Sequence, residues 1–180
     1  MWFVYLFTII FSNIITAAFN PISFLGLLVP CGSLFVGLTF ILRDLCQEKY
    51  GRKKIYYLII LAMILSAIGS FFLGDSLSIV FASCISFLIS ESCDTEIYTR
   101  LKLPIHMRVM YSGVVGGILD SVIFVILGLS PIGAGMLTWT LVPSAICGQI
   151  LFKVLMQFIG CLFIKYRKST SIEVLFCVLL

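Results

Sequence analysis

Charged residues are scarce in this chain of 180 residues, where they make up 11% of the sequence. Soluble globular proteins contain about 25% charged residues. Hydrophobic residues make up 61%, the mean hydropathy is +1.19, and no long polar stretch interrupts the hydrophobic segments. The composition excludes an ordinary soluble protein and predicts an all-α, polytopic membrane protein in the lipid bilayer.

Motifs of soluble-enzyme chemistry are also missing. The chain contains a single histidine, His106, and its seven cysteines include no CxxC pair. It has no Gly-rich phosphate loop, no nucleophile elbow and no HExxH helix. We therefore expect no enzyme activity, no catalytic residue, no cofactor and no metal site, and we interpret the cysteines as small apolar packing residues.

Long apolar segments repeat along the chain, and a helix needs roughly 20 residues to cross a bilayer. On this measure the sequence predicts six spans, at residues 2–19, 22–42, 55–73, 77–96, 107–129 and 137–164. The sixth segment is long, so its helix is expected to tilt or to start late. We expect one transmembrane domain over residues 1–168 and a short tail over residues 169–180.

The basic residues are confined to alternate connections. Eleven of the twelve flank the second and fourth connections or follow the sixth span, namely Arg43, Lys49, Arg52, Lys53, Lys54, Arg100, Lys102, Arg108, Lys165, Arg167 and Lys168. The positive-inside rule places these regions and both termini in the cytoplasm. The net charge of +4 is thereby explained as a topology signal, and no nucleic-acid partner is expected.

Charged groups inside the bilayer are candidate functional sites, because each costs about 2.5 to 3.5 kcal/mol to insert. Asp120 follows Arg108 by twelve residues, and Lys153 precedes Lys165 by twelve, so both lie near the midplane. Gln149 and Lys153 belong to a polar stripe with i, i+4 spacing along the sixth span. Either a structural ion pair between Asp120 and Lys153 or a substrate site fits this pattern.

Small residues surround Asp120. Ser112 stands four residues before Gly116, and Gly113 stands four before Gly117. Small residues at this spacing allow another helix to approach closely.

The segment "ISESCDTEIYTR" brings three carboxylates to the end of the fourth span. Glu91, Asp94 and Tyr98 share one helix face at i, i+3, i+7 spacing, whereas Glu96 points elsewhere and is expected to be solvated or to pair with Arg100. The shared face would bind a ligand with several N–H donors, or pair with Arg43 or other cations of the inner leaflet.

The second span contains Pro30 and Gly32, which predict a kink or an unwound turn. If the helix restarts near Gly32 and continues to Tyr50, its inner end carries Arg43, Asp44 and Gln47. Broken helices at membrane depth are typical of transporter sites, although a simple kink fits as well.

Four runs together resemble the YhhQ or VUT family of vitamin and queuosine-precursor transporters. They are "VPCGSLFVGLTFILRDLCQEKYGRK", "ASCISFLISESCDTEIYTRLK", "SGVVGGILDSVIFVILG" and "LFKVL". The resemblance implies uptake of deazaguanine bases across a bacterial inner membrane, with cyano- or aminomethyl-deazaguanine or queuine as substrate. It implies polar site positions at Arg43, Asp44, Gln47, Glu91, Asp94, Tyr98, Asp120 and Lys153, and at Asn13 in the first span.

The chemistry of a deazaguanine fits these residues. A carboxylate such as Glu91 or Asp94 would accept its two parallel N–H donors, and a donor such as Lys153 would bind its carbonyl oxygen. A transporter of another vitamin-like molecule and a membrane enzyme with clustered carboxylates are the alternatives. Proton coupling, facilitated diffusion, an external energising module and a homodimer all stay open.

Overall fold

The computed structural model describes residues 1–19, 22–24, 27–29 and 31–169, which form six α-helices and a short β-hairpin. The hairpin pairs β1 (Ile22–Phe24) antiparallel with β2 (Leu27–Val29). The helices are α1 (Trp2–Ala18), α2 (Ser33–Tyr50), α3 (Arg52–Phe72), α4 (Leu77–Arg100), α5 (Ile105–Phe124), its π-helical continuation η1 (Val125–Leu129), and α6 (Val142–Ser169).

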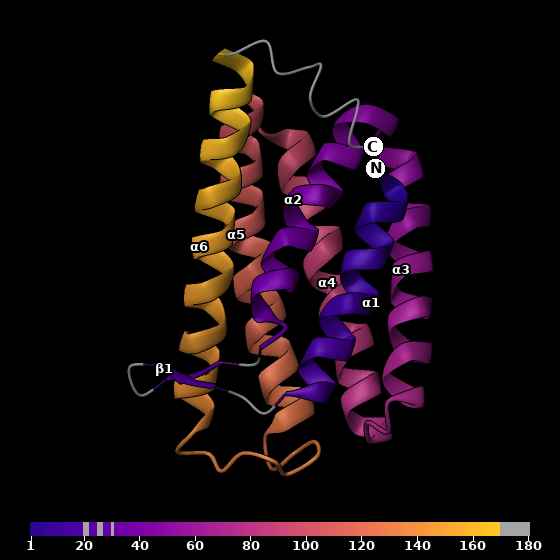
Figure 1. Ribbon diagram of the computed structural model, residues 1–180, viewed down its shortest axis with the longest axis vertical. Helices are drawn as coiled ribbons and strands as arrows, with labels where there is room; N and C mark the ends of the chain where they lie inside the picture. The colour runs from indigo at the N-terminus through magenta and orange to yellow at the C-terminus, as the bar shows by residue number, and fades with distance from the viewer. Residues whose placement is uncertain (20–21, 25–26, 30, 170–180) are drawn as a thin grey trace.

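The helices run side by side along the long axis of the molecule (Figure 1). The connections from α2 to α3 and from α4 to α5 lie at one end, together with the start of α1 and the last turn of α6 (Figure 1). We call this the basic end, because Lys49, Arg52, Arg100, Lys102 and Arg108 lie in or beside these connections. The hairpin and the other two connections lie at the opposite end, which we call the hairpin end.

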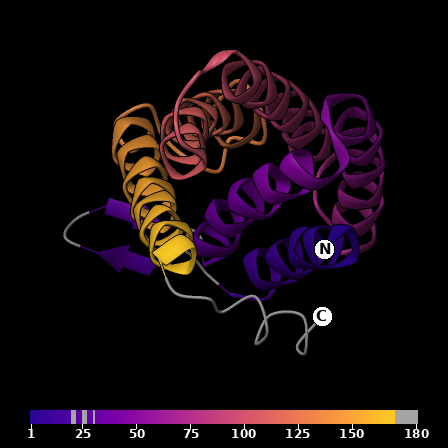
Figure 2. The same cartoon turned by 90° about the horizontal axis from the view of Figure 1, so that it is seen from above.

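Four helices of the described residues are long and apolar enough to cross a membrane: α3, α4, α5 with η1, and α6. α1 is a shorter apolar helix. α2 lies in the middle of the bundle and contacts every other helix (Figure 2). The prediction of an all-α, multi-pass membrane fold is confirmed, and the helix that its neighbours surround is α2, which contains Arg43 and Asp44.

The prediction of a helix from residue 22 is wrong for residues 22–24 and 27–29, which form the strands β1 and β2. A short apolar run fits a strand as well as a helix, and a proline disfavours helix in the residue before it, here Val29. The predicted kink at Pro30 lies outside the described residues. The restart near Gly32 is confirmed, since α2 begins at Ser33 and ends at Tyr50. The late start of the sixth helix is confirmed too, at Val142.

Gly32 sets a close contact between α1 and α2. A β-carbon at this position would lie 2.6 Å from the Ser12 carbonyl oxygen, so a larger residue would force the two helices apart. The Ser12 hydroxyl donates a hydrogen bond of 3.0 Å to the Gly32 carbonyl oxygen. This contact fixes α2 against α1 at the point where α2 begins.

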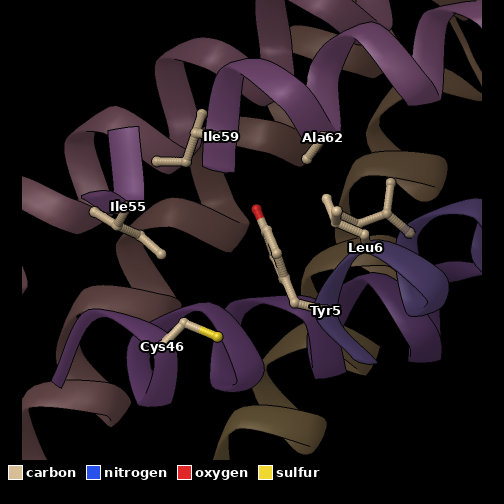
Figure 3. Close-up of a cluster of buried hydrophobic side chains, with 7 residues drawn as sticks. Tyr5, Leu6, Cys46, Ile55, Ile59 and Ala62 are labelled. Carbon is tan, nitrogen blue, oxygen red and sulfur yellow. The ribbon is translucent and has the colours of Figure 1, made fainter. Parts of the chain in front are cut away.

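An apolar cluster joins the first three helices near the basic end (Figure 3). These buried apolar side chains hold the three helices together through van der Waals contacts. The labelled members are Tyr5 and Leu6 on α1, Cys46 on α2, and Ile55, Ile59 and Ala62 on α3.

Candidate functional site

A cavity of about 350 Å³ lies among the helices, between the hairpin end and the middle of the bundle. Phe19, Asp75 and Met136, in connections at the hairpin end, belong to its lining, so the cavity reaches that end. Its wall contains polar as well as apolar side chains. The polar lining residues are Asn13, Asp75, Asp120, Gln149, Lys153 and eight serines and threonines, namely Ser12, Thr16, Ser33, Thr39, Ser66, Ser70, Ser83 and Ser86.

Asp120 on α5 and Lys153 on α6 form an ion pair at this cavity. The Lys153 ammonium donates to the Asp120 carboxylate at 2.7 Å, to the Ser121 hydroxyl at 2.8 Å and to the Gln149 side-chain oxygen at 3.3 Å. Lys153 is 2% exposed and Asp120 is 15% exposed. One cation therefore balances one carboxylate, and the carboxylate keeps a face toward the cavity.

Asn13 forms part of the opposite wall. Its side-chain amide donates to the Ser66 hydroxyl at 2.7 Å and to the Ser66 carbonyl oxygen at 3.4 Å, which ties α1 to α3. The amide is therefore held in one orientation, with its oxygen left to accept from a ligand.

A second polar cluster surrounds Arg43 of α2, and none of its charged residues lines the cavity. The Arg43 Nη2 atom forms ion pairs with Asp44, at 2.6 Å, and with Asp94. Its Nη1 atom lies 3.3 Å from the Glu91 carboxylate. All four side chains are at most 1% exposed. We call Arg43, Asp44, Glu91 and Asp94 the Arg43 cluster.

Tyr98 and Gln47 make contacts nearer the basic end. The Tyr98 hydroxyl donates to the Glu48 carboxylate at 2.8 Å, and Arg108 donates to the same carboxylate at 3.1 Å. The Arg108 guanidinium lies 4.6 Å from the centre of the Tyr98 ring. The Gln47 amide donates to the Thr99 hydroxyl at 2.9 Å. These contacts join α2, α4 and α5 and close the bundle at this end.

Glycines of α5 make room for side chains of both the Arg43 cluster and the ion pair of Asp120 and Lys153. A β-carbon at Gly116 would lie 3.0 Å from the Asp94 β-carbon and 3.2 Å from the Phe40 ring, and one at Gly117 would lie 3.4 Å from the Lys153 β-carbon. The small-residue spacing predicted close helix approach, and here it also makes room for charged side chains. Because Gly116 and Gly117 are adjacent, the Arg43 cluster and the ion pair lie on neighbouring faces of one helix.

The residues predicted as a site thus fall into two groups. Those at the cavity are Asn13, Asp120, Gln149 and Lys153, and those away from it are Arg43, Asp44, Gln47, Glu91, Asp94 and Tyr98. The predicted pairing of Asp120 with Lys153 is confirmed, as is that of Glu96 with Arg100 at 3.5 Å. By its position in the sequence, Arg43 is one of the basic residues that flank the predicted cytoplasmic connections. In the structure its side chain is completely buried.

Sequence reasoning missed the hydroxyl groups of the cavity wall and the role of Glu48. The spacing of the serines was an available signal: Ser66 and Ser70 on α3, and Ser83 and Ser86 on α4, lie one helical turn apart and face one side. Serine is common in membrane helices, so this signal stands out less than a charge.

Comparison with known proteins identifies the family. Residues 69–167, more than half of the chain, match the family described as "Putative vitamin uptake transporter". The comparison with curated proteins gives no match, and neither does the comparison with solved structures. The matched range contains α4, α5 and most of α6, with both carboxylates of the "SESCD" run and the Asp120 to Lys153 pair. The chain belongs to the vitamin uptake transporter family, whose substrates are small molecules carried across a bilayer.

Proposed function

We propose that this protein imports deazaguanine bases, the precursors of queuosine, across a bacterial inner membrane, and that Asp120 and Lys153 bind the base. The observation that carries the proposal is the ion pair of these two side chains beside a polar cavity. Membership of the vitamin uptake transporter family supports transport of a small molecule.

The pair of charges matches one edge of a deazaguanine. That edge presents an exocyclic amine, a ring N–H and a carbonyl oxygen in a row, which is two donors followed by one acceptor. A carboxylate accepts two parallel N–H donors, and an ammonium beside it donates to the carbonyl oxygen. The three N–H groups of Lys153 already donate to Asp120, Ser121 and Gln149, so the carbonyl oxygen of the base would replace the longest of these bonds, that of 3.3 Å to Gln149. Asp120 and Lys153 supply this order of groups at neighbouring positions, 2.7 Å apart.

The rest of the cavity suits a flat, polar ring. Its volume of about 350 Å³ lies within the usual range of small-molecule sites, about 300 to 1,000 Å³. Phe87 and Phe124 belong to the lining and offer rings on which a base can stack. Tyr98 lies away from the cavity and its hydroxyl donates to Glu48, so it is not a stacking partner in this arrangement.

The closed basic end and the cavity toward the hairpin end support a transport cycle with alternating access. If the basic end faces the cytoplasm, as the positive-inside rule predicts, the structure corresponds to a state in which the base enters from outside. Release into the cytoplasm then requires the Arg43 cluster and the contacts of Glu48 to separate.

Rescue of queuosine in transfer RNA tests the proposal. Cells that lack both precursor synthesis and their own transporter receive this gene and one of cyano-deazaguanine, aminomethyl-deazaguanine or queuine at nanomolar-range concentration. We expect the wild type to restore queuosine. Asp120→Asn should lower uptake about ten- to hundredfold, because a charged hydrogen bond contributes about 1.5 to 3 kcal/mol.

Asp75→Asn is the matched control, since Asp75 also lines the cavity but lies in the connection at the hairpin end. It should keep uptake near the wild-type level. Membrane insertion of each variant is measured in parallel. Absence of rescue by a correctly inserted wild type with all three bases would contradict the proposed substrate class.

A further inference from the structure

The Arg43 cluster holds more negative than positive charge. Three carboxylates, those of Asp44, Glu91 and Asp94, surround a single guanidinium, and all four side chains are at most 1% exposed. With every group ionised, the cluster would carry two uncompensated negative charges. A buried charge without a partner is strongly unfavourable, and a carboxylate in this position takes up a proton instead.

The contacts of Arg43 with the three carboxylates are unequal. Its Nη2 atom donates to Asp44 at 2.6 Å and contacts Asp94. Its Nη1 atom donates to the backbone carbonyl oxygen of Glu91 at 2.9 Å and to the Thr95 hydroxyl at 2.9 Å. Both hydrogens of Nη1 are therefore committed. Among the described residues, neither carboxylate oxygen of Glu91 accepts a hydrogen bond, and the same holds for Asp94. Asp94 is nevertheless in direct contact with Nη2, whereas Glu91 lies 3.3 Å from Nη1, whose hydrogens are used elsewhere. Glu91 is therefore the carboxylate that Arg43 compensates least.

Other ionisable groups around Glu91 make its charge still less favourable. Its electrostatic partners on neighbouring helices are Arg43 and Asp44 on α2, Asp120 on α5 and Tyr5 on α1, and Asp94 lies on its own helix. No charged group on α3 or η1 is among the partners of Glu91 in the described part of the chain. Arg43, the one cation of this set, is shared by three carboxylates. The Tyr5 hydroxyl lies among apolar side chains (Figure 3), is completely buried and has no hydrogen-bond partner among the described residues.

We propose that Glu91 binds a proton in the sealed state and releases it on the cytoplasmic side, so that uptake is coupled to proton entry. The coupling to uptake rests on the proposed function, whereas proton binding by Glu91 does not. A metal ion suits the Arg43 cluster less well than a proton. Among the described residues, no group of three His, Cys, Asp or Glu side chains is placed to coordinate a metal ion.

The position of Glu91 gives the proton a short route. Phe87, one helical turn before Glu91, lines the cavity, and so does Asp120, which interacts with Glu91 electrostatically. A proton from water in the cavity converts the Glu91 carboxylate into a neutral carboxylic acid, which tolerates burial. When the proton leaves, Glu91 repels Asp94, Asp44 and Asp120, and this repulsion favours separation of the Arg43 cluster toward cytoplasmic water.

Infrared spectroscopy of the purified, lipid-reconstituted protein tests proton binding without any substrate. A protonated carboxylic acid has a C=O stretching band that a carboxylate lacks. We expect this band in the wild type near neutral pH. Its intensity should decrease in Glu91→Gln, which keeps the shape of a neutral Glu91, and any remaining band belongs to a second protonated carboxyl of the cluster, because protonation of Glu91 removes only one of the two excess negative charges. Glu96→Gln is the matched control, because Glu96 lies on the same helix, is 29% exposed and pairs with Arg52 and Arg100. It should keep the band.

Proteoliposomes test the coupling, with labelled cyano-deazaguanine as the probe. A pH gradient, acid outside, should drive accumulation by the wild type and by Glu96→Gln. Glu91→Gln should lose this accumulation, yet still exchange labelled for unlabelled base at equal pH.

The two measurements separate the proton proposal from the proposed function. The proton proposal is overturned by absence of the protonated carboxyl band in the wild type, by an unchanged intensity of this band in Glu91→Gln, or by uptake that follows a sodium gradient and ignores pH. Absence of transport of the base, with the band present and weaker in Glu91→Gln, would overturn the proposed substrate and the coupling to its uptake while supporting the proton site.

Discussion

The two polar centres of the bundle differ in charge balance and in access to water. Asp120 and Lys153 form a balanced pair beside the cavity, with Asp120 15% exposed. The Arg43 cluster sets one cation among three carboxylates and is closed on all sides. A balanced pair beside a cavity needs no further charge, whereas an unbalanced, buried cluster is stabilised when one of its carboxylates takes up a proton. In our proposal, the first centre binds the substrate and the second controls the conformational change.

The difference also explains the placement of α2. This helix lies inside the bundle and contacts every other helix (Figure 2), so its charged face meets protein rather than lipid. Intramembrane charges are tolerated where they face a bundle interior or a water-filled cavity. Separation of α2 from α4 would expose the Arg43 cluster to water, and this is the movement that release into the cytoplasm requires.

Removal of the central cation should have the largest effect on stability. Arg43→Gln leaves three buried carboxylates without their common partner, and the loss of one member of a buried ion pair costs about 3 to 5 kcal/mol. We expect this loss in the free energy of unfolding, measured in mixed lipid and dodecyl sulfate micelles. Stability at the wild-type level would show that the cluster is not held together by Arg43.

A smaller effect is expected where α2 meets α6. A β-carbon at Gly37 would lie 2.6 Å from the Met156 β-carbon, which is close to the backbone and cannot rotate away. Gly37→Ala should therefore destabilise the protein by about 1 to 3 kcal/mol, and it should lower uptake because Lys153 lies on the same part of α6.

Gly69→Ala is the matched control for that substitution. A β-carbon at Gly69 has no neighbouring atom within 4 Å, and alanine is favoured over glycine inside a helix by about 0.5 to 1 kcal/mol. We expect a small gain in stability. If both variants lost a comparable amount of stability, the close contact between α2 and α6 at Gly37 would not be the cause of the loss.

Removal of an ion pair at the basic end should have the smallest effect on stability. Arg52 is 50% exposed and pairs with Glu96, which Arg100 also approaches. Exposed pairs of this kind gain little in water, so Arg52→Gln should leave the free energy of unfolding unchanged within error. A loss as large as that of Arg43→Gln would erase the distinction between the exposed and the buried charges.

Much of the membrane fold and one contact of the site followed from the sequence. Counting residues from the basic anchors placed Asp120 and Lys153 at similar depth, and the two side chains do meet. Helical spacing separated Glu96 from Glu91 and Asp94, and the structure leaves Glu96 partly exposed while the other two are buried. Both inferences depend only on the rise and the turn of a single helix.

The remaining features depend on how the helices assemble. The sequence predicts a helix where the strands of residues 22–24 and 27–29 lie, because a short apolar run does not distinguish a strand from a helix. Glu91 and Asp120 are both acidic residues within spans, yet only Asp120 lines the cavity. That division results from the packing of α2 against α4 and α5, which no periodicity within one segment encodes.

Cysteine accessibility along α4 tests the central distinction most directly. Ser83 lines the cavity, whereas Ser90, two turns further on the same face, is completely buried and lies outside the lining. Each is replaced by cysteine in a chain without its native cysteines, and a membrane-impermeant thiol reagent is added to whole cells. We expect Ser83→Cys to react, cyano-deazaguanine to slow that reaction, and Ser90→Cys to stay unmodified. Equal reaction at both positions, or a rate at Ser83→Cys that the base leaves unchanged, would contradict the account.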